Sequence, residues 1–124
     1  KLPKVISKKK KIYDTYMRKL RHLSGLAPAF IDPRTSPVYW FTSFLCENIE
    51  EFSDYLLKHK IQTRRFFYPL HQQPCYKKST AKVRMHSKYP ISEMIFNMGI
   101  SFPSSYNLKE DQQIEIIKRI KEFY

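Results

Sequence analysis

Residues 61–76 (Ile-Gln-Thr-Arg-Arg-Phe-Phe-Tyr-Pro-Leu-His-Gln-Gln-Pro-Cys-Tyr) combine side chains that can hold an anion with side chains that can stack on a ring. A guanidinium group presents a rigid fork of donors that matches a phosphate or a carboxylate, and it also stacks on aromatic faces. Prolines at positions 69 and 74 exclude a continuous helix or a central strand. We therefore expect Arg64, Tyr68 and His71 on or beside an irregular loop, where polar side chains often bind ligands.

Several of these side chains also allow a purely structural interpretation. In a strand, Arg64 and Arg65 point to opposite faces, so at most one of them aims into a given pocket, and Arg65 suits a solvent-facing position. His71 could bind a sugar hydroxyl or a phosphate, or it could satisfy a buried carbonyl group. Tyr39 and Trp40 could offer a flat face to a base or a sugar ring, or they could fill the core of a strand.

Other chemistries lack the residue patterns that they need. Cys46 and Cys75 lie far apart without metal-like spacing, so we interpret them as free thiols in a reducing compartment, which favours a cytoplasmic location. The histidines are scattered and predict no metal site. Two glycines in the whole chain are too few for a glycine-rich phosphate loop. No apolar run approaches the roughly 20 residues that span a bilayer, so we expect no membrane partner.

The chain is strongly basic, with a formal net charge of +12 over 124 residues. Its main basic regions are the run 8–11 and the segment 77–88. Such a surplus attracts phosphorylated ligands and nucleic acids over long distances. One interpretation is a solvated surface. The alternative is a basic nucleic-acid-binding module that adds exposed aromatic side chains for stacking.

Apolar periodicity predicts the elements that must position these groups. Three- and four-residue steps predict a helix over 2–23, whose apolar stripe is interrupted by Lys9 and which ends near Gly25. Residues 38–45 are rich in β-branched and aromatic side chains and predict a largely buried strand. Asn48 and Glu51 have capping-box spacing and predict a helix that runs to about residue 59. Residues 61–67 form the next predicted strand.

The remaining third of the chain predicts a loop, two helices and one strand. Residues 77–88 are polar and lack periodicity, as a surface loop would. Pro90 suits the first turn of a helix over 91–98, and a short strand follows at 100–102. Asn107 and Glu110 predict the start of the last helix, whose expected buried face is Ile114, Ile117, Ile120 and Tyr124. Helices and strands in this order describe a small α/β domain with helices packed on a short sheet.

The motif Thr-Arg-x-Phe-Phe-Tyr-Pro-Leu-His-x-x-Pro-x-Tyr at 63–76 accompanies Val-Tyr-Trp at 38–40 and Ser-Phe-Pro at 101–103. Together they resemble the C-terminal part of the DegT/DnrJ/EryC1/StrS family of sugar aminotransferases, and most of all its perosamine synthetases. The resemblance implies an α/β (α+β) fold, the small C-terminal domain of a fold-type I aminotransferase. It implies a linking helix over 1–25 and the small domain over 26–124. The large domain that binds pyridoxal phosphate (PLP) would be absent from this chain.

The resemblance also implies an activity. Such enzymes use PLP to transfer an amino group from glutamate to a nucleotide-linked 4-keto-6-deoxy sugar, and they work as dimers with shared sites. Because the large domain of such enzymes holds the catalytic lysine and most of the cofactor contacts, we expect no catalytic residue here. An enzyme of this kind also implies no nucleic-acid partner. The expected substrate-binding residues are Arg64, Phe67, Tyr68, His71 and Trp40.

One departure from the family pattern concerns a helix end. Lys60 stands where relatives have glycine before the Ile-x-Thr-Arg strand. A side chain at a left-handed position is strained, so we expect the helix that ends near residue 59 to terminate differently.

Overall fold

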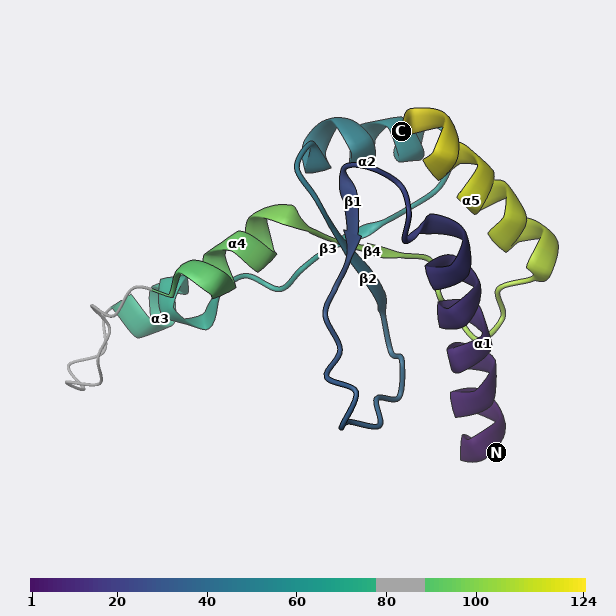
Figure 1. The fold of residues 1–124 in the computed structure, drawn as a ribbon. Coiled ribbons are helices and arrows are strands. Elements are labelled where there is room, and N and C mark those ends of the chain that lie inside the picture. The colour runs from purple at the N-terminus through teal and green to yellow at the C-terminus, as the bar shows by residue number, and fades with distance from the viewer. Residues whose placement is uncertain (78–88) are drawn as a thin grey trace.

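The computed structural model describes residues 1–77 and 89–124, so the predicted loop over 77–88 lies outside the described residues except for its first position. Figure 1 shows helices around a small central sheet, which confirms the predicted mixture of helix and strand. The helices are α1 (Leu2–Leu20), α2 (Ile49–Lys58), α3 (Pro74–Lys77), α4 (Pro90–Met98), α5 (Glu110–Phe123) and a 3-10 turn, η1 (Leu70–Gln72). The strands are β1 (Leu26–Pro28), β2 (Thr42–Cys46), β3 (Arg64–Arg65) and β4 (Gly99–Phe102).

The four strands form one antiparallel sheet in the order β1-β2-β4-β3. Strand β4 is buried along its whole length and has a strand on each side. Its first residue must be glycine. A methyl group on Gly99 would lie 2.4 Å from the carbonyl oxygen of Ile95 and 2.5 Å from the ring of Phe66. Contacts that short cannot form without moving the backbone of α4 or the chain after β3.

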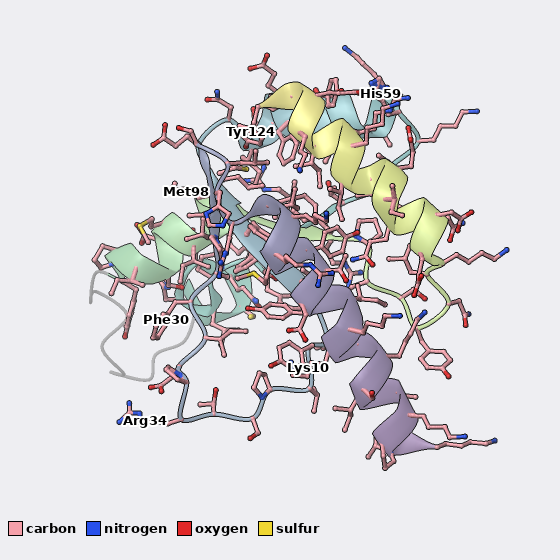
Figure 2. The ribbon with its side chains drawn as sticks, turned by 45° about the vertical axis from the view of Figure 1, so that its right-hand side comes forward. Lys10, Phe30, Arg34, His59, Met98 and Tyr124 are labelled. Atoms are coloured by element: carbon pink, nitrogen blue, oxygen red, sulfur yellow. The ribbon has the colours of Figure 1, made fainter. Side chains whose placement is uncertain are left out.

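The main core lies between one face of the sheet and three helices, α1, α2 and α5, which gather on one side of the molecule (Figures 1 and 2). Burial of apolar side chains on this face is the main stabilising contribution. Helix α4 also contacts β2 and β4, but none of its residues is buried. The core residues are Ile12, Tyr16, Leu20, Leu26, Phe44, Cys46, Ile49, Phe52, Leu56, Ile61, Ile100, Phe102, Ile116, Ile117 and Ile120.

The first helix forms as predicted but ends at Leu20, three residues early. Gly25, with a φ of 82°, then turns the chain into β1, a strand that the sequence analysis did not predict. The buried residues of α1 belong to the same core as those of α2 and α5. The division into a linking helix over 1–25 and a domain over 26–124 stays a prediction.

The strand predicted over 38–45 was wrong in its first half, because β2 begins only at Thr42. Tyr39 has a φ of 51°, a left-handed conformation that no strand contains. Val38 and Trp40 are consequently exposed and do not fill the core. The strand predicted over 61–67 is likewise reduced to Arg64–Arg65.

Helix α2 has Asn48 at its N-cap position, as predicted, but the side-chain hydrogen bond of the capping box is not formed. The expectation that its other end would terminate differently was wrong. Lys60 adopts a φ of 62°. Its N–H donates to Leu57 O at 2.8 Å, and Ile61 N–H donates to Leu56 O at 2.9 Å. This is the Schellman arrangement that glycine usually completes.

The last helix was also predicted with the wrong start and, in part, the wrong face. Its N-cap is Lys109, whose N–H donates to Gln112 Oε1 at 3.1 Å, rather than Asn107. Ile114 is 65% exposed, whereas Gln113 is buried and donates to Ile12 O at 2.8 Å. The buried face therefore runs through Gln113, Ile116, Ile117 and Ile120.

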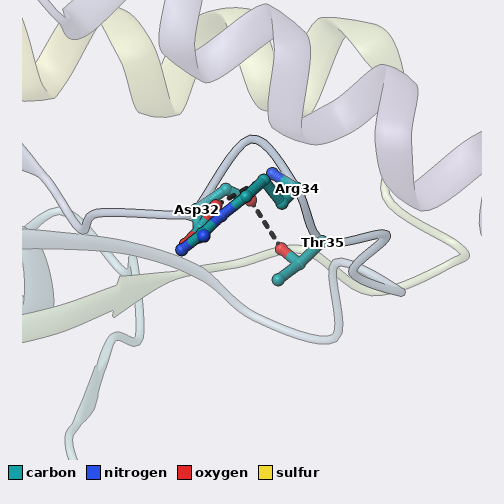
Figure 3. Close-up of polar contacts among 3 residues, drawn as sticks. All are labelled: Asp32, Arg34 and Thr35. Carbon is teal, nitrogen blue, oxygen red and sulfur yellow. Dashed lines mark hydrogen bonds and ion pairs between the residues drawn. The ribbon is translucent and has the colours of Figure 1, made fainter.

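A long loop over 29–41 joins β1 to β2 and extends alongside the N-terminal half of α1 (Figure 1). Its outer turn is closed by local contacts, shown in Figure 3. Asp32 accepts from the guanidinium of Arg34 at 2.6 Å, and the Thr35 hydroxyl donates to Asp32 O at 2.7 Å. Figure 2 shows Arg34 at this outer turn, away from the core. These contacts hold the outer turn, from which the loop returns to the sheet through Trp40 and Phe41.

Candidate functional site

An open cavity of about 400 Å³ lies between the N-terminal half of α1, β3, the end of the 29–41 loop and the chain that follows β4. Its lining combines two cations, aromatic rings, hydroxyl groups and one amide. Aromatic walls with a few convergent polar groups are typical of sites for small molecules. The lining residues are Lys9, Trp40, Phe41, Gln62, Thr63, Arg64, Ser101, Phe102, Pro103, Ser104 and Ser105.

Arg64 reaches this cavity because β3 pairs with β4, which places Arg64 opposite Ser101. Its guanidinium carbon lies 5.6 Å from the centre of the Phe41 ring, a cation–π distance. Arg65 points the other way, where its Nη2 donates to the carbonyl oxygens of Phe96 and Asn97 at 3.5 Å and 3.4 Å. The alternation of a strand therefore sends one arginine to the cavity and the other to the C-terminal end of α4.

Two aromatic side chains, Trp40 and Phe41, line the cavity beside Arg64, and a third, Phe67, lies next to them outside the lining. The rings of Trp40 and Phe41 are stacked, with centroids 4.6 Å apart and planes 22° apart. The ring of Phe67 lies 6.5 Å from that of Trp40 and 6.3 Å from that of Phe41. Trp40 is 64% exposed and Phe67 is 70% exposed. The structure thus brings together three of the five predicted site residues, Trp40, Arg64 and Phe67. They surround Phe41, which the sequence analysis had placed in a strand and not in the site.

The other two predicted site residues, Tyr68 and His71, lie against α4, away from this group of side chains. The ring of Tyr68 packs edge-on against Phe96 at 5.1 Å. His71, in η1, lies with its Nε2 2.9 Å from Glu93 Oε1, and its side chain is only 18% exposed. The hydrogen bond from His71, and a second from the neighbouring glutamine, lower the pKa of the Glu93 carboxyl group.

Lys9 was missed as a site residue, although its place in an apolar stripe was the signal that could have found it. Its Nζ donates to Trp40 O at 2.6 Å, to Ser104 O, and to Ser104 Oγ at 3.3 Å. Burial lowers the pKa of this ammonium group. With Lys9, Arg64 and no carboxylate in the lining, the cavity is positive. Its hydroxyl groups and aromatic faces add partners for a ring that carries hydroxyls, so the chemistry suits a sugar linked to an anionic group.

The lysine run 8–11 does not present four free cations. Lys9 is turned toward the cavity, Lys10 pairs with Asp14 at 2.6 Å, and Lys11 pairs with Glu110 on α5. The other basic region, 77–88, falls mostly outside the described residues. The described part of the chain therefore gives no observation that favours the nucleic-acid-binding module.

Within residues 1–77 and 89–124, no group of three histidine, cysteine, aspartate or glutamate side chains could hold a metal ion. None of the helices in those ranges is both long enough and apolar enough to cross a membrane.

Comparison with known sequences gives one family and two similar proteins. The model of the DegT/DnrJ/EryC1/StrS aminotransferase family matches residues 1–121. The chain is 34% identical over 122 residues to GDP-perosamine synthase of Escherichia coli O157:H7, which spans 96% of this chain and 31% of that protein. It is 32% identical over 93 residues to GDP-perosamine synthase of Vibrio cholerae, 69% of this chain and 24% of that protein. The chain thus spans about a third or less of the length of these relatives.

Comparison with solved structures gives the same fold. The sugar aminotransferase CalS13 from Micromonospora echinospora superposes with a TM-score of 0.84 at 15% identity, over 97% of this chain and 31% of that one. Spr1654 from Streptococcus pneumoniae, in its PMP form, superposes with a TM-score of 0.78 at 22% identity, over 97% and 31%. The predicted arrangement of helices on a short sheet is therefore confirmed as that of the corresponding part of sugar aminotransferases.

Proposed function

The chain belongs to the DegT/DnrJ/EryC1/StrS aminotransferase family, and from that premise we propose that it is the C-terminal small domain of a nucleotide-sugar aminotransferase. The reaction is transfer of an amino group from glutamate to a 4-keto-6-deoxy sugar that is linked to a nucleotide. The two GDP-perosamine synthases support this substrate class, with a guanosine diphosphate as the first nucleotide to test. Residues 1–25 act as the linking helix and 26–124 as the small domain.

The observation that carries the proposal is the position of Arg64. Its guanidinium group lies over the Phe41 ring at a cavity that contains a second cation, hydroxyl groups and no carboxylate. A charge-assisted bond between this arginine and a phosphate would hold the nucleotide end of the substrate. Trp40 and Phe67 would stack on the base or the sugar. Only a ligand that extends from the cavity to α4 would reach Tyr68 and His71 as well.

The cofactor implied by the family is PLP, and a neighbour solved in a PMP form supports it. PLP takes a lysine for its imine and a charged partner for its ring nitrogen. In the cavity lining, the one lysine is Lys9, which already donates to two main-chain carbonyl groups, and no carboxylate accompanies it. The residues that line this cavity therefore do not fit the cofactor by themselves. We propose that the cofactor is held outside this segment and assign this chain no catalytic residue.

What this chain contributes is substrate positioning and closure over the bound substrate, not proton transfer. We propose a homodimer with shared sites as the working form, as the resemblance implies. Two free cysteines, Cys46 and Cys75, support a reducing compartment such as the cytoplasm.

The first test is the intact mass and the visible spectrum of the native polypeptide, followed by an amino-transfer assay. A polypeptide about three times as long as this chain, yellow with bound PLP and able to aminate GDP-4-keto-6-deoxymannose with glutamate, is the expected result. A native polypeptide of 15.0 kDa that neither binds PLP nor aminates this sugar would refute the proposal.

The second test uses two adjacent arginines as a matched pair. Arg64→Ala removes a phosphate contact worth about 1.5–3 kcal/mol, so KM for the nucleotide sugar should rise roughly 10- to 100-fold. Arg65→Ala removes the same charge on the opposite face, where the guanidinium group donates to main-chain carbonyl groups of α4, and KM should stay unchanged. Equal effects of the two substitutions would show that the cavity is not the substrate site.

A further inference from the structure

Three segments that are distant in sequence meet at the side chain of Lys9. From α1 its ammonium group donates to Trp40 O at the end of the 29–41 loop, and to the carbonyl and hydroxyl oxygens of Ser104 after β4. The Ser104 hydroxyl group in turn lies 3.4 Å from Trp40 O, to which it donates. Three donors on one flexible stem thus fix the main chain at Trp40 and at Ser104, two residues that line the same cavity.

The residue before Trp40 shows how strictly this part of the loop is held. Tyr39 adopts a φ of 51°, which costs a residue other than glycine roughly 1–2 kcal/mol. Helix α1 contacts it twice. The Tyr13 ring lies 4.6 Å from the Tyr39 ring, and Lys10 Nζ lies 5.9 Å from the centre of that ring. A strained backbone persists only where its surroundings fix it, and such positions gather at ligand sites.

The consequence for Trp40 is an indole that is exposed and yet stacked on a neighbouring ring. It is stacked on Phe41 at 4.6 Å although 64% of its surface reaches solvent. No core packing explains that position, whereas a ring held at the rim of a cavity is ready to stack on a ligand.

We propose that Lys9 is a positioning residue, whose ammonium group fixes the main chain of Trp40 so that the indole ring forms the stacking wall of the nucleotide-sugar cavity. This inference rests on the proposed function. Lys9 itself need not touch the ligand, because its donors are directed at main-chain and hydroxyl oxygens. A methionine at position 9 would fill the same space, but it would leave Ser104 O without this donor and Trp40 O with only the 3.4 Å hydrogen bond from the Ser104 hydroxyl group.

The experiment compares Lys9→Met with Lys4→Met, a lysine exposed on the first turn of the same helix. The experiment uses the full-length polypeptide, in which any tryptophan outside this segment is first replaced by phenylalanine. Trp40 is the single tryptophan of this sequence, so its fluorescence anisotropy decay then reports its motion directly. Lys9→Met should add a fast component to this decay, Lys4→Met should leave it unchanged, and Lys9→Arg should preserve most of the restriction. If Lys9→Met fails to fold by circular dichroism, Lys9→Gln, which keeps a donor on a shorter stem, takes its place.

Ligand binding gives the second readout, measured by calorimetry with GDP-mannose as the probe. Trp40→Ala should raise the dissociation constant about tenfold, a normal value for loss of one stacking partner, and Lys9→Met should raise it about three- to tenfold. The double variant should bind no more weakly than Trp40→Ala alone, because Lys9 acts through Trp40. A merely structural role for Lys9 would make the two effects additive instead.

The outcomes separate the two proposals. An unchanged anisotropy decay in Lys9→Met, or additive losses in the double variant, would overturn the positioning role. A freed Trp40 with unchanged GDP-mannose affinity would overturn it as well. No binding of GDP-mannose by the unaltered protein would instead overturn the proposed function, and the anisotropy decay alone would then decide whether Lys9 holds Trp40.

Discussion

Lys60 occupies the position after α2 where the backbone turns left-handed, with a φ of 62°. For a residue with a Cβ atom this conformation costs roughly 1–2 kcal/mol, which glycine avoids. Glycine loses more conformational entropy on folding, by about 0.5–1 kcal/mol. The balance predicts that Lys60→Gly stabilises the protein by about 0.5–1 kcal/mol, or roughly 2–5 °C in Tm for a chain of this size.

Nothing else at this helix end should change with the substitution. The hydrogen bonds that complete the turn come from the N–H groups of Lys60 and Ile61, and glycine keeps the first and does not touch the second. Ile61 remains packed in the core with Leu56, the apolar contact that accompanies this motif. The stabilisation should therefore come from the backbone of residue 60 alone.

The assay is urea unfolding followed by circular dichroism, with the slope m compared between variants. Lys58→Gly serves as the matched control, because it makes the same substitution two residues earlier, inside α2, where glycine destabilises by about 0.5–1 kcal/mol. Lys60→Ala keeps the strain and should change the free energy of unfolding by less than about 0.5 kcal/mol. A Lys60→Gly protein that is no more stable than the original would refute the argument from backbone strain.

Three further substitutions test the packing and the electrostatics. Gly99→Ala places a methyl group 2.5 Å from the Phe66 ring and should lower the free energy of unfolding by about 1–3 kcal/mol, measured by urea unfolding. Tyr16→Phe leaves a carbonyl group without the 2.9 Å hydrogen bond from the phenol and should destabilise by about 1 kcal/mol in the same assay; no change would contradict it. Because His71 lowers the pKa of Glu93 below its ordinary 4.5, Glu93→Gln should lower stability above about pH 4.5, and its difference from the original protein should vanish as the pH falls further.

The sequence predicted best those elements whose ends are marked by proline or glycine. The helix over 91–98 and the strand over 100–102 were placed within one residue, because proline and glycine mark their ends. The last helix was harder. Its sequence holds four isoleucines, and periodicity alone does not tell which of them turns inward. The buried Gln113, which bonds to Ile12 O across two helices, selects the observed face, and that contact is tertiary.

The site was predicted in part for a related reason. Residue types and strand alternation predicted that at most one of Arg64 and Arg65 reaches a given pocket, with Arg64 as the candidate. The contacts of each arginine show that Arg64 faces the cavity and that Arg65 faces α4. The aromatic residues before β2 looked like core because β propensity describes packing and not backbone conformation. Nothing local in the sequence indicates that Tyr39 is left-handed. Lys9 holds the chain after Tyr39 in place, from 31 residues away.

The two residues other than glycine that have a left-handed backbone occupy similar places in the chain. Among the described residues, Tyr39 and Lys60 are the only ones other than glycine with positive φ. Tyr39 directly precedes Trp40 and Phe41, and Lys60 stands two residues before the segment 62–64, so each turns the chain immediately before a part of the cavity lining. The two differ in what fixes them. Tyr39 is held by contacts from α1, whereas Lys60 is held by the hydrogen bonds of a helix end that glycine would make equally well.

This difference separates strain that serves the site from strain that the fold merely tolerates. If Lys60 is only tolerated, Lys60→Gly will gain stability while the affinity for GDP-mannose stays unchanged. Tyr39→Gly should behave oppositely. It removes the ring that packs against Tyr13 and frees the backbone before Trp40, so the indole should gain motion and the affinity should fall, even where the relief of strain offsets the lost packing. Opposite results at two positions with the same backbone conformation would show that the cavity depends on what holds the loop, and not on left-handed geometry as such.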